Sequence, residues 1–146
     1  MLTMEMLQDA KKVLDGVARK TPVFQSTYIN PDADVYIKCE NMQVTGSFKL
    51  RGAYFKTASL TDAEAQKGVI ACSAGNHAQG VALAAQKKGI PAVICMPESA
   101  PMAKVEATRS YGAEVVLVPG VYDDAAAKAT QLQQEKGYTF LHPFND

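Results

Sequence analysis

The sequence predicts an α/β protein with an open parallel sheet of about four strands flanked by helices. From Val69 onwards, short apolar runs alternate with helical stretches of roughly a dozen residues or more, which is the pattern of repeated strand and helix units. The runs read VIAC, AVICM, VVLV and TFL. Because they are almost continuously apolar, both faces of the sheet are expected to be covered by helices. Each intervening helix ends just before a strand at Gly89, Gly112 or Gly137, as glycine helix stops do.

Two further elements are expected before this repeat. Apolar side chains recur at helical spacing over residues 4–19, with Thr3 as the cap, and Thr21-Pro22 ends the run. The run VYIKCE over residues 35–40 predicts a strand. The N-terminal part of the chain thus carries a helix and a strand that do not belong to the repeated pattern.

Composition and charge exclude several classes of function. The chain has 146 residues, 47% of them hydrophobic, which suffices for one domain core. Its 15 basic and 15 acidic residues leave no charge excess for binding nucleic acid or an anionic membrane surface. No stretch approaches the roughly 20 apolar residues that a membrane span needs, and no secretory leader is evident. We therefore expect a soluble cytoplasmic protein.

The cysteines and histidines do not suggest a metal site or disulfides. Cys39, Cys72 and Cys95 are odd in number and lie in strand-like runs, which favours buried reduced thiols. His77 and His142 are the two histidines, and zinc-ligand spacing is absent. We expect Cys72 and His142 to be packing residues.

The stretch QVTGSFKLRGAYFK predicts a short helix from Phe48 to Lys56, entered from Ser47 as its cap. Lys49 then lies in the first turn, where the positive helix end disfavours an ammonium, and packing between Phe48 and Leu50 would disfavour it further. A neutral lysine amine is the nucleophile that forms a Schiff base with a carbonyl compound. The alternative is a surface lysine whose stem lies over apolar neighbours.

The segment SAGNHAQG, residues 73–80, follows the first apolar run and predicts a small-residue turn that opens a helix. Such a turn presents backbone N–H groups at a positive helix end, which suits a carboxylate or a phosphate. A nucleotide-hydrolysing P-loop is disfavoured because Val81-Ala82 follows Gly80 where that motif carries lysine and Ser/Thr. The alternative is a tight structural turn capped by Asn76. His77 could act as a general base, but in a first turn a structural, supporting role is expected.

Taken together, ENMQVTGSFKLRGA and ACSAGNHAQGVALAA resemble the fold-type-II pyridoxal phosphate enzymes, which share a tryptophan-synthase-β-like fold. The similarity is to the branch that contains threonine dehydratase, serine dehydratase and serine racemase. PESAPMAKVEATRSYGAEVVLV and LHPFND also resemble that branch, so the similarity runs through the whole chain.

The resemblance implies specific roles for the two motifs. Lys49 would hold pyridoxal 5'-phosphate covalently and then move the α-proton of the substrate, with Phe48 packed near the pyridine ring. The turn after the first strand would bind the substrate carboxylate through N–H groups and a serine hydroxyl. This turn comprises Ser73, Ala74, Gly75, Asn76 and His77. Asn76 would also donate a hydrogen bond to the phenolic oxygen of the cofactor.

The resemblance also implies a reaction, namely dehydration and deamination of L-threonine or L-serine to a 2-oxo acid and ammonia. Lys49-Leu50-Arg51 favours the dehydratases over β- or γ-replacement enzymes, which usually carry Lys-Asp-Arg. Racemases of this branch carry a serine at the position of Ala74, and a methyl group cannot deliver a proton. The parent enzyme is implied to be a cytoplasmic homo-oligomer of amino-acid metabolism, in isoleucine biosynthesis or in catabolism.

The similarity covers only the N-terminal part of such an enzyme, so we expect a truncated piece. Residues 1–55 would be an N-terminal segment of the large cofactor domain, and residues 56–146 a small βα domain. The glycine-rich loop that binds the cofactor phosphate would lie further along the chain, so little turnover is expected from these 146 residues. Two alternatives stay open, a non-catalytic module that binds an amino acid or a nucleotide, and a serine racemase.

Overall fold

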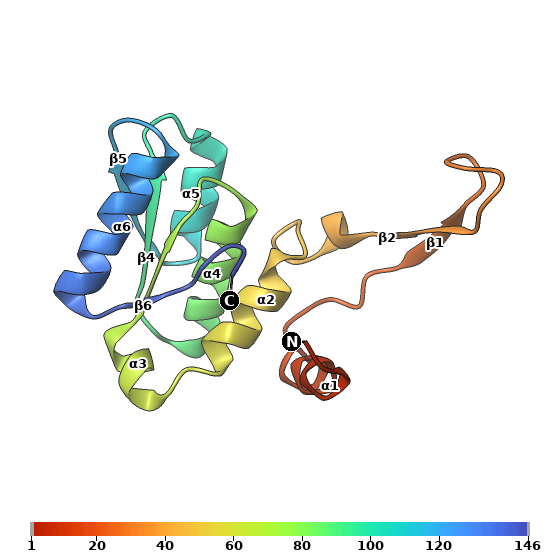
Figure 1. Ribbon diagram of the computed structural model, residues 1–146, viewed down its shortest axis with the longest axis horizontal. Coiled ribbons are helices and arrows are strands. Elements are labelled where there is room, and N and C mark those ends of the chain that lie inside the picture. The colour runs from red at the N-terminus through yellow and green to blue at the C-terminus, as the bar shows by residue number, and fades with distance from the viewer. Residues whose placement is uncertain (1, 146) are drawn as a thin grey trace.

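The computed structural model describes residues 2–145 and contains a four-stranded parallel sheet with helices on both faces (Figure 1). The strand order is β5-β4-β3-β6, and each neighbouring pair is parallel. The strands are β3 (Val69–Cys72), β4 (Ala92–Pro97), β5 (Glu114–Val118) and β6 (Thr139–Phe140). These strands coincide with the four predicted apolar runs, so the predicted sheet is confirmed.

Helices α4 (Asn76–Lys88), α5 (Met102–Ser110) and α6 (Tyr122–Lys136) connect the strands. Helix α6 covers one face of the sheet, where Ala125 and Ala129 pack in a cluster with Ile70 and Val93. Helices α4 and α5 cover the other face. The predicted coverage of both faces is therefore confirmed.

Glycines end the connecting helices as the sequence predicted. Gly89 follows α4 with φ 68° and Gly137 follows α6 with φ 73°, both in the left-handed region. A residue without a Cβ adopts this conformation at no steric cost, so the chain turns sharply into the next strand. Between α2 (Lys49–Ala58) and the sheet, a short helix α3 (Asp62–Lys67) was not predicted, although Thr61 and Glu64 form a capping box at its start.

The first helix is shorter than predicted. Helix α1 covers Met4–Val13, and its predicted cap is confirmed because Thr3 Oγ1 accepts from Met6 N at 3.2 Å. The prediction that it continues to residue 19 is wrong, since the helix ends at its C-cap Leu14 and residues 14–17 form turns, in which Gly16 adopts φ 71°. None of the residues in α1 is buried, so its apolar face does not pack against the rest of residues 2–145 as a core helix would.

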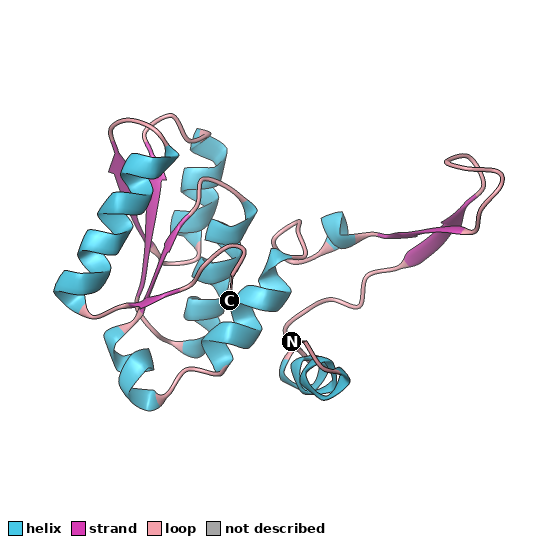
Figure 2. Cartoon of the chain, viewed as in Figure 1, coloured by secondary structure: helices cyan, strands magenta, loops and turns pink. Residues whose placement is uncertain are grey.

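A two-stranded ribbon of β1 (Val23–Ser26) and β2 (Val35–Lys38) projects away from the parallel sheet (Figure 2). The two strands are antiparallel, with Val23 opposite Lys38. The strand predicted over residues 35–40 is present but ends at Lys38, and Glu40 already begins a 3-10 turn, while β1 was missed. A short 3-10 turn, η1 (Glu40–Met42), then leads towards α2.

Cys72 and Cys95 are buried neighbours in β3 and β4, as predicted. Cys39 is half-buried and follows the end of β2, so the prediction that it is buried in a strand is wrong. Within residues 2–145, no helix is both long and apolar enough to traverse a bilayer. The same residues contain no group of three His, Cys, Asp or Glu side chains that could hold a metal ion.

Candidate functional site

Lys49 lies in the first turn of α2, as the sequence predicted, although the helix begins at Lys49 rather than at Phe48. The N-cap residue is Phe48, so the prediction of Ser47 as the cap is wrong by one position, although Ser47 Oγ accepts from Lys49 N at 3.3 Å. Leu50 is fully buried and anchors the helix start, whereas the Phe48 side chain is 59% exposed. The expectation that Lys49 is wedged between two buried neighbours is therefore wrong. Residues two apart on a helix point in nearly opposite directions, so Phe48 and Leu50 cannot both face the core.

The amine of Lys49 faces the segment that follows β6. Its Nζ donates to the carbonyl oxygen of Pro143 at 2.7 Å. It also lies 5.1 Å from the centroid of the Phe144 ring and 5.6 Å from that of the Phe48 ring. An ammonium within about 6 Å of an aromatic face is attracted by the ring. The Lys49 amine is thus held near two aromatic rings and one carbonyl.

The turn between β3 and α4 presents backbone N–H donors at the start of a helix. Cys72 ends β3, Asn76 begins α4, and Gly75 N donates to Ser73 Oγ at 3.3 Å within the turn. No side chain caps the N-terminus of α4, and its first turn contains no acidic residue. The N–H groups of an uncapped first turn can bind a carboxylate or a phosphate. The location predicted for this turn, at the carboxyl end of a parallel strand, is confirmed.

Helices α2 and α4 approach each other closely at Gly80. A Cβ atom built on Gly80 would lie 3.2 Å from the carbonyl carbon and oxygen of Lys49 and 3.3 Å from Leu50 N. Asn76 lies four residues before Gly80, so both are on one face of α4, the face that packs against the start of α2. Close backbone contact at Gly80 thus brings Lys49 and the turn at Asn76 to the same side of the molecule.

His77 has a structural position. Its side chain is buried, and Nε2 lies 3.0 Å from the carbonyl oxygen of Leu141, to which it can donate in the appropriate tautomer. The imidazole therefore points towards the exit of β6, and the expected supporting role agrees with this contact. Lys49 and His77 together hold the segment from Leu141 to Pro143 against the starts of α2 and α4.

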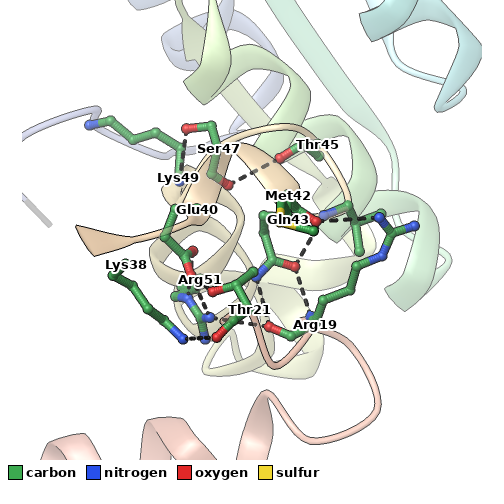
Figure 3. Close-up of polar contacts among 11 residues, drawn as sticks. Arg19, Thr21, Lys38, Glu40, Met42, Gln43, Thr45, Ser47, Lys49 and Arg51 are labelled. Carbon is green, nitrogen blue, oxygen red and sulfur yellow. Dashed lines mark hydrogen bonds and ion pairs between the residues drawn. The ribbon is translucent and has the colours of Figure 1, made fainter. Parts of the chain in front are cut away.

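A polar cluster fixes the loop that leads to Lys49 (Figure 3). Glu40 accepts from Arg51 Nε at 2.9 Å, from Arg51 Nη2 at 2.8 Å and from Thr21 Oγ1 at 2.6 Å. The hydrogen bonds from Arg51 are the main reason that the pKa of Glu40 falls to about 2, and Thr21 adds to this effect against partial burial. The same pairing raises the pKa of Arg51.

Gln43 connects this loop to the segment after α1. Its buried side chain accepts from Arg19 N at 2.7 Å and donates to Arg19 O at 3.0 Å, as a neighbouring strand would. Oε1 also accepts from Val44 N at 3.1 Å. Hydrogen bonds therefore hold residues 39–47 at several points before the chain enters α2. Sequence reasoning missed this cluster, although an acidic and a basic residue on either side of the loop were a visible signal.

Lys104 is a second contact that the sequence did not indicate. It lies in the first turn of α5, and its Nζ donates to Asn76 Oδ1 at 2.8 Å. The structure therefore gathers Lys49, the turn at residues 73–77, Lys104 and the segment 141–144 at one edge of the fold. This arrangement is an α/β domain whose candidate site lies at the carboxyl edge of the parallel strands, where ligands bind in open α/β sheets.

Comparison with known proteins identifies the family to which this α/β domain belongs. The family model described as "Pyridoxal-phosphate dependent enzyme" matches residues 14–146. The chain belongs to this family of pyridoxal-phosphate dependent enzymes, and its fold is that of fold type II.

Curated relatives include the L-threonine ammonia-lyase of Thermotoga maritima, which is 47% identical over 100% of this chain and 37% of its own length. The L-threonine dehydratase catabolic TdcB of Staphylococcus aureus is 46% identical over 96% of this chain and 41% of its own length. This chain thus spans about two fifths of these relatives and matches an N-terminal portion.

Solved structures show the same similarity. Maize serine racemase superimposes with a TM-score of 0.91 at 35% identity, covering 98% of this chain and 44% of that one. Threonine deaminase isoform 2 of Solanum lycopersicum has a TM-score of 0.88 at 39% identity, covering 97% of this chain and 42% of that one. The resemblance found in the sequence and the predicted fold class are both confirmed.

Proposed function

We propose that this chain is the N-terminal portion of an enzyme that dehydrates and deaminates L-threonine or L-serine to a 2-oxo acid and ammonia. The family match supports pyridoxal 5'-phosphate as the cofactor, and the names of the curated relatives support the reaction. The single observation that carries the proposal is the position of Lys49, a primary amine at the start of α2, whose backbone lies in close contact with Gly80 of α4, the helix opened by the turn.

The residues of the chain fit the cofactor. Lys49 would hold its aldehyde covalently, and the released amine would take the α-proton of the substrate. When bound, pyridoxal phosphate supplies an electron sink for the bonds at the α-carbon. The exposed ring of Phe48 is available to pack near the pyridine ring, and its centroid lies 5.6 Å from Lys49 Nζ. The amide of Asn76 would donate to the phenolic oxygen.

The turn at residues 73–77 would bind the substrate carboxylate. The proposed donors are the backbone N–H groups of Ala74, Gly75, Asn76 and His77 together with the hydroxyl of Ser73. The uncapped start of α4 and its lack of acidic residues support this role. The side chain of His77 takes no part, because it faces the carbonyl of Leu141.

The remaining length of the relatives is proposed to complete the site with the phosphate-binding loop and the group facing the pyridine nitrogen. We keep the division into a large-domain segment at 1–55 and a small βα domain at 56–146 as a proposal. The unburied helix α1 supports it, as do exposed apolar side chains on the ribbon such as Phe24 and Tyr36. The boundary after residue 55 falls within α2. Alone, the chain should bind the cofactor weakly and turn over little substrate.

Serine racemisation is the second candidate, since serine racemases are among the similar structures. Racemisation requires a second group that delivers a proton to the opposite face of the α-carbon. The turn carries Ala74 where the resemblance implies a serine in racemases, so elimination is favoured. The word "catabolic" in the name of the Staphylococcus aureus relative favours a degradative role over isoleucine biosynthesis. A homo-oligomeric parent and a cytoplasmic location stay predictions.

Borohydride reduction of the complete polypeptide with its cofactor, followed by peptide mapping, tests the proposal. We expect the cofactor on Lys49, and loss of both labelling and dehydratase activity in Lys49→Ala. Lys56→Ala, which removes another lysine from the same helix, should retain both. Labelling of a different residue, or turnover by Lys49→Ala, would remove Lys49 from the mechanism. Heat released on adding an amino acid or nucleotide to a protein that is never labelled would favour the binding-module alternative.

A further inference from the structure

A lysine contacts the amide that is proposed to meet the cofactor. Lys104 Nζ donates to Asn76 Oδ1 at 2.8 Å, and the two residues lie in the first turns of α5 and α4. Within residues 2–145, the Nδ2 group of Asn76 has no hydrogen-bond partner. One end of the amide is therefore held by a cation, and its other end is available to a ligand.

The chemistry of the pair determines which end faces which way. A lysine ammonium has three donors and no acceptor, so only the oxygen of the Asn76 amide can face it. The two orientations of an asparagine amide have the same shape and differ only in where oxygen and nitrogen lie. A fixed cation on one side selects the orientation that turns the N–H donors of Nδ2 to the other side.

The position of Lys104 is costly for the helix that carries it. A cation in the first turn of α5 meets the positive end of the helix dipole, and no acidic residue in that turn offsets it. The start of α4 has no acidic residue either. A local choice that opposes helix electrostatics is expected where a functional contact outweighs it. The hydrogen bond to Asn76 is the contact that the structure shows for the side chain of Lys104.

We propose that Lys104 is a positioning residue that holds Asn76 with its Nδ2 donors directed to the phenolic oxygen of the cofactor. The inference rests on the proposed function, because Asn76 matters in this way only if it meets the cofactor. Without Lys104 the amide could adopt either orientation, and the one that presents Nδ2 would be populated about half the time. Cofactor affinity would then fall about twofold. Removal of the amide, which loses the hydrogen bond itself, should cost about tenfold.

The orientation can be measured on the 146-residue chain without cofactor. In nitrogen-15 NMR spectra, we expect Lys104→Met to move the Asn76 side-chain amide signals towards those of the exposed Asn41, and Lys104→Arg to restore them. Lys128→Met is the matched control, because Lys128 Nζ donates to the amide oxygen of Gln131 at 3.1 Å in α6. It should move the Gln131 signals and leave Asn76 unchanged. Unchanged Asn76 signals in Lys104→Met would overturn the inference.

The consequence for the cofactor is measured on the complete enzyme by titration with pyridoxal phosphate and by the absorbance ratio of its phenol and phenolate forms. We expect Asn76→Ala to weaken cofactor binding and to change the absorbance ratio, and Lys104→Met to do both to a smaller extent. Lys104→Arg should restore both readouts. If Asn76→Ala shifts both readouts and Lys104→Met neither, the inference is wrong while the proposed function stands. If neither variant shifts them, the proposed contact of Asn76 is wrong and the inference fails with it, whereas labelling of Lys49 is unaffected.

Discussion

Gly80 and Lys49 are in backbone contact across the interface of α4 and α2. The Cβ of any other residue at position 80 would lie 3.2 Å from both the carbonyl carbon and the carbonyl oxygen of Lys49. Such a distance is shorter than a normal van der Waals contact between carbon atoms. The absence of a side chain at Gly80 therefore sets how close Lys49 comes to the turn at Asn76.

Gly80→Ala should destabilise the chain despite the higher helix propensity of alanine. The propensity gain is about 1 kcal/mol, while overpacking against backbone costs about 1–3 kcal/mol. We expect the free energy of unfolding to fall by about 1 kcal/mol, measured by urea denaturation. In the complete enzyme the same change should also weaken cofactor binding, because α2 must shift away from α4.

Gly52→Ala is the matched control for this prediction. Gly52 lies in the interior of α2, is exposed, and a Cβ built on it meets nothing within 4 Å. Its substitution should stabilise the chain by up to about 1 kcal/mol. If Gly80→Ala is as stable as Gly52→Ala, the two helices adjust easily and the close approach does not position Lys49.

The repeated strands and helices could be predicted from sequence because each one carries its own signal. VIAC and AVICM are apolar throughout, and the glycine after each helix marks its end. Strand β1 gave no such signal, since Val23, Phe24 and Gln25 are all exposed and no alternation of burial separates its faces. The end of α1 at Val13 was missed because the apolar spacing continues to Val17, whereas residues 14–17 form turns that include Gly16 in the left-handed conformation.

The motifs around Lys49 and Asn76 could be located from sequence, but their contacts could not. Lys49 bonds to Pro143, 94 residues away, and Lys104 bonds to Asn76, 28 residues away. Local propensity does not determine which side chains meet across such separations; tertiary packing does. The exposure of Phe48 was mispredicted for the same reason, because an apolar residue type does not reveal which face of a helix is buried.

Glu40→Gln should reduce stability at neutral pH. It should also make the stability depend less on pH in the acid range. The pKa of Glu40 is about 2 in the folded chain, against an ordinary value of 4.5. A carboxylate with a lowered folded-state pKa contributes stability above its unfolded pKa, and this contribution is lost as the pH falls through the folded value. Wild type should therefore lose stability between pH 4.5 and about 2 in a way that the variant does not.

At neutral pH, Glu40→Gln should lower the free energy of unfolding by about 2 kcal/mol, since it weakens two hydrogen bonds from Arg51 to a charged group. Glu106→Gln is the control, because Glu106 pairs with Arg109 at 2.9 Å on the exposed surface of α5. That pair should contribute less than about 1 kcal/mol. Equal acid profiles for Glu40→Gln and wild type in thermal unfolding would show that the cluster does not hold the loop before Lys49.

His77→Ala should destabilise the chain by about 2 kcal/mol, because the buried carbonyl of Leu141 loses its imidazole partner and a cavity is left. The loss should appear locally as faster hydrogen exchange at Leu141 N, which bonds to Ile70 O at 2.8 Å and joins β6 to β3. Exchange at Val93 N, between the central strands, should change only as far as global stability does. Equal changes at both sites would indicate that His77 contributes only general packing.

Gln79→Met should stabilise the chain, in contrast to His77→Ala. Gln79 is 6% exposed, and its Nε2 is buried without a hydrogen-bond partner among residues 2–145. Methionine has a similar volume and removes the unpaired donor, so the free energy of unfolding should rise by about 1 kcal/mol. Urea denaturation of the 146-residue chain measures this effect. A less stable variant would mean that Nε2 is satisfied in solution, by water for example.

The cysteines should differ in reactivity according to burial. Burial is the main cause that raises the pKa of Cys95 to about 11, and it also raises the pKa of Cys72. At pH 8 only about one Cys95 thiol in a thousand is then ionised, and the thiolate is the reactive form. Iodoacetamide should label the half-buried Cys39 first, while Cys72 and Cys95 react at the rate of unfolding and become equal to Cys39 in urea. Rapid native labelling of Cys95, measured by peptide mass spectrometry, would mean that β3 and β4 open locally, and the turn after β3 could not then be the rigid support that its proposed role requires.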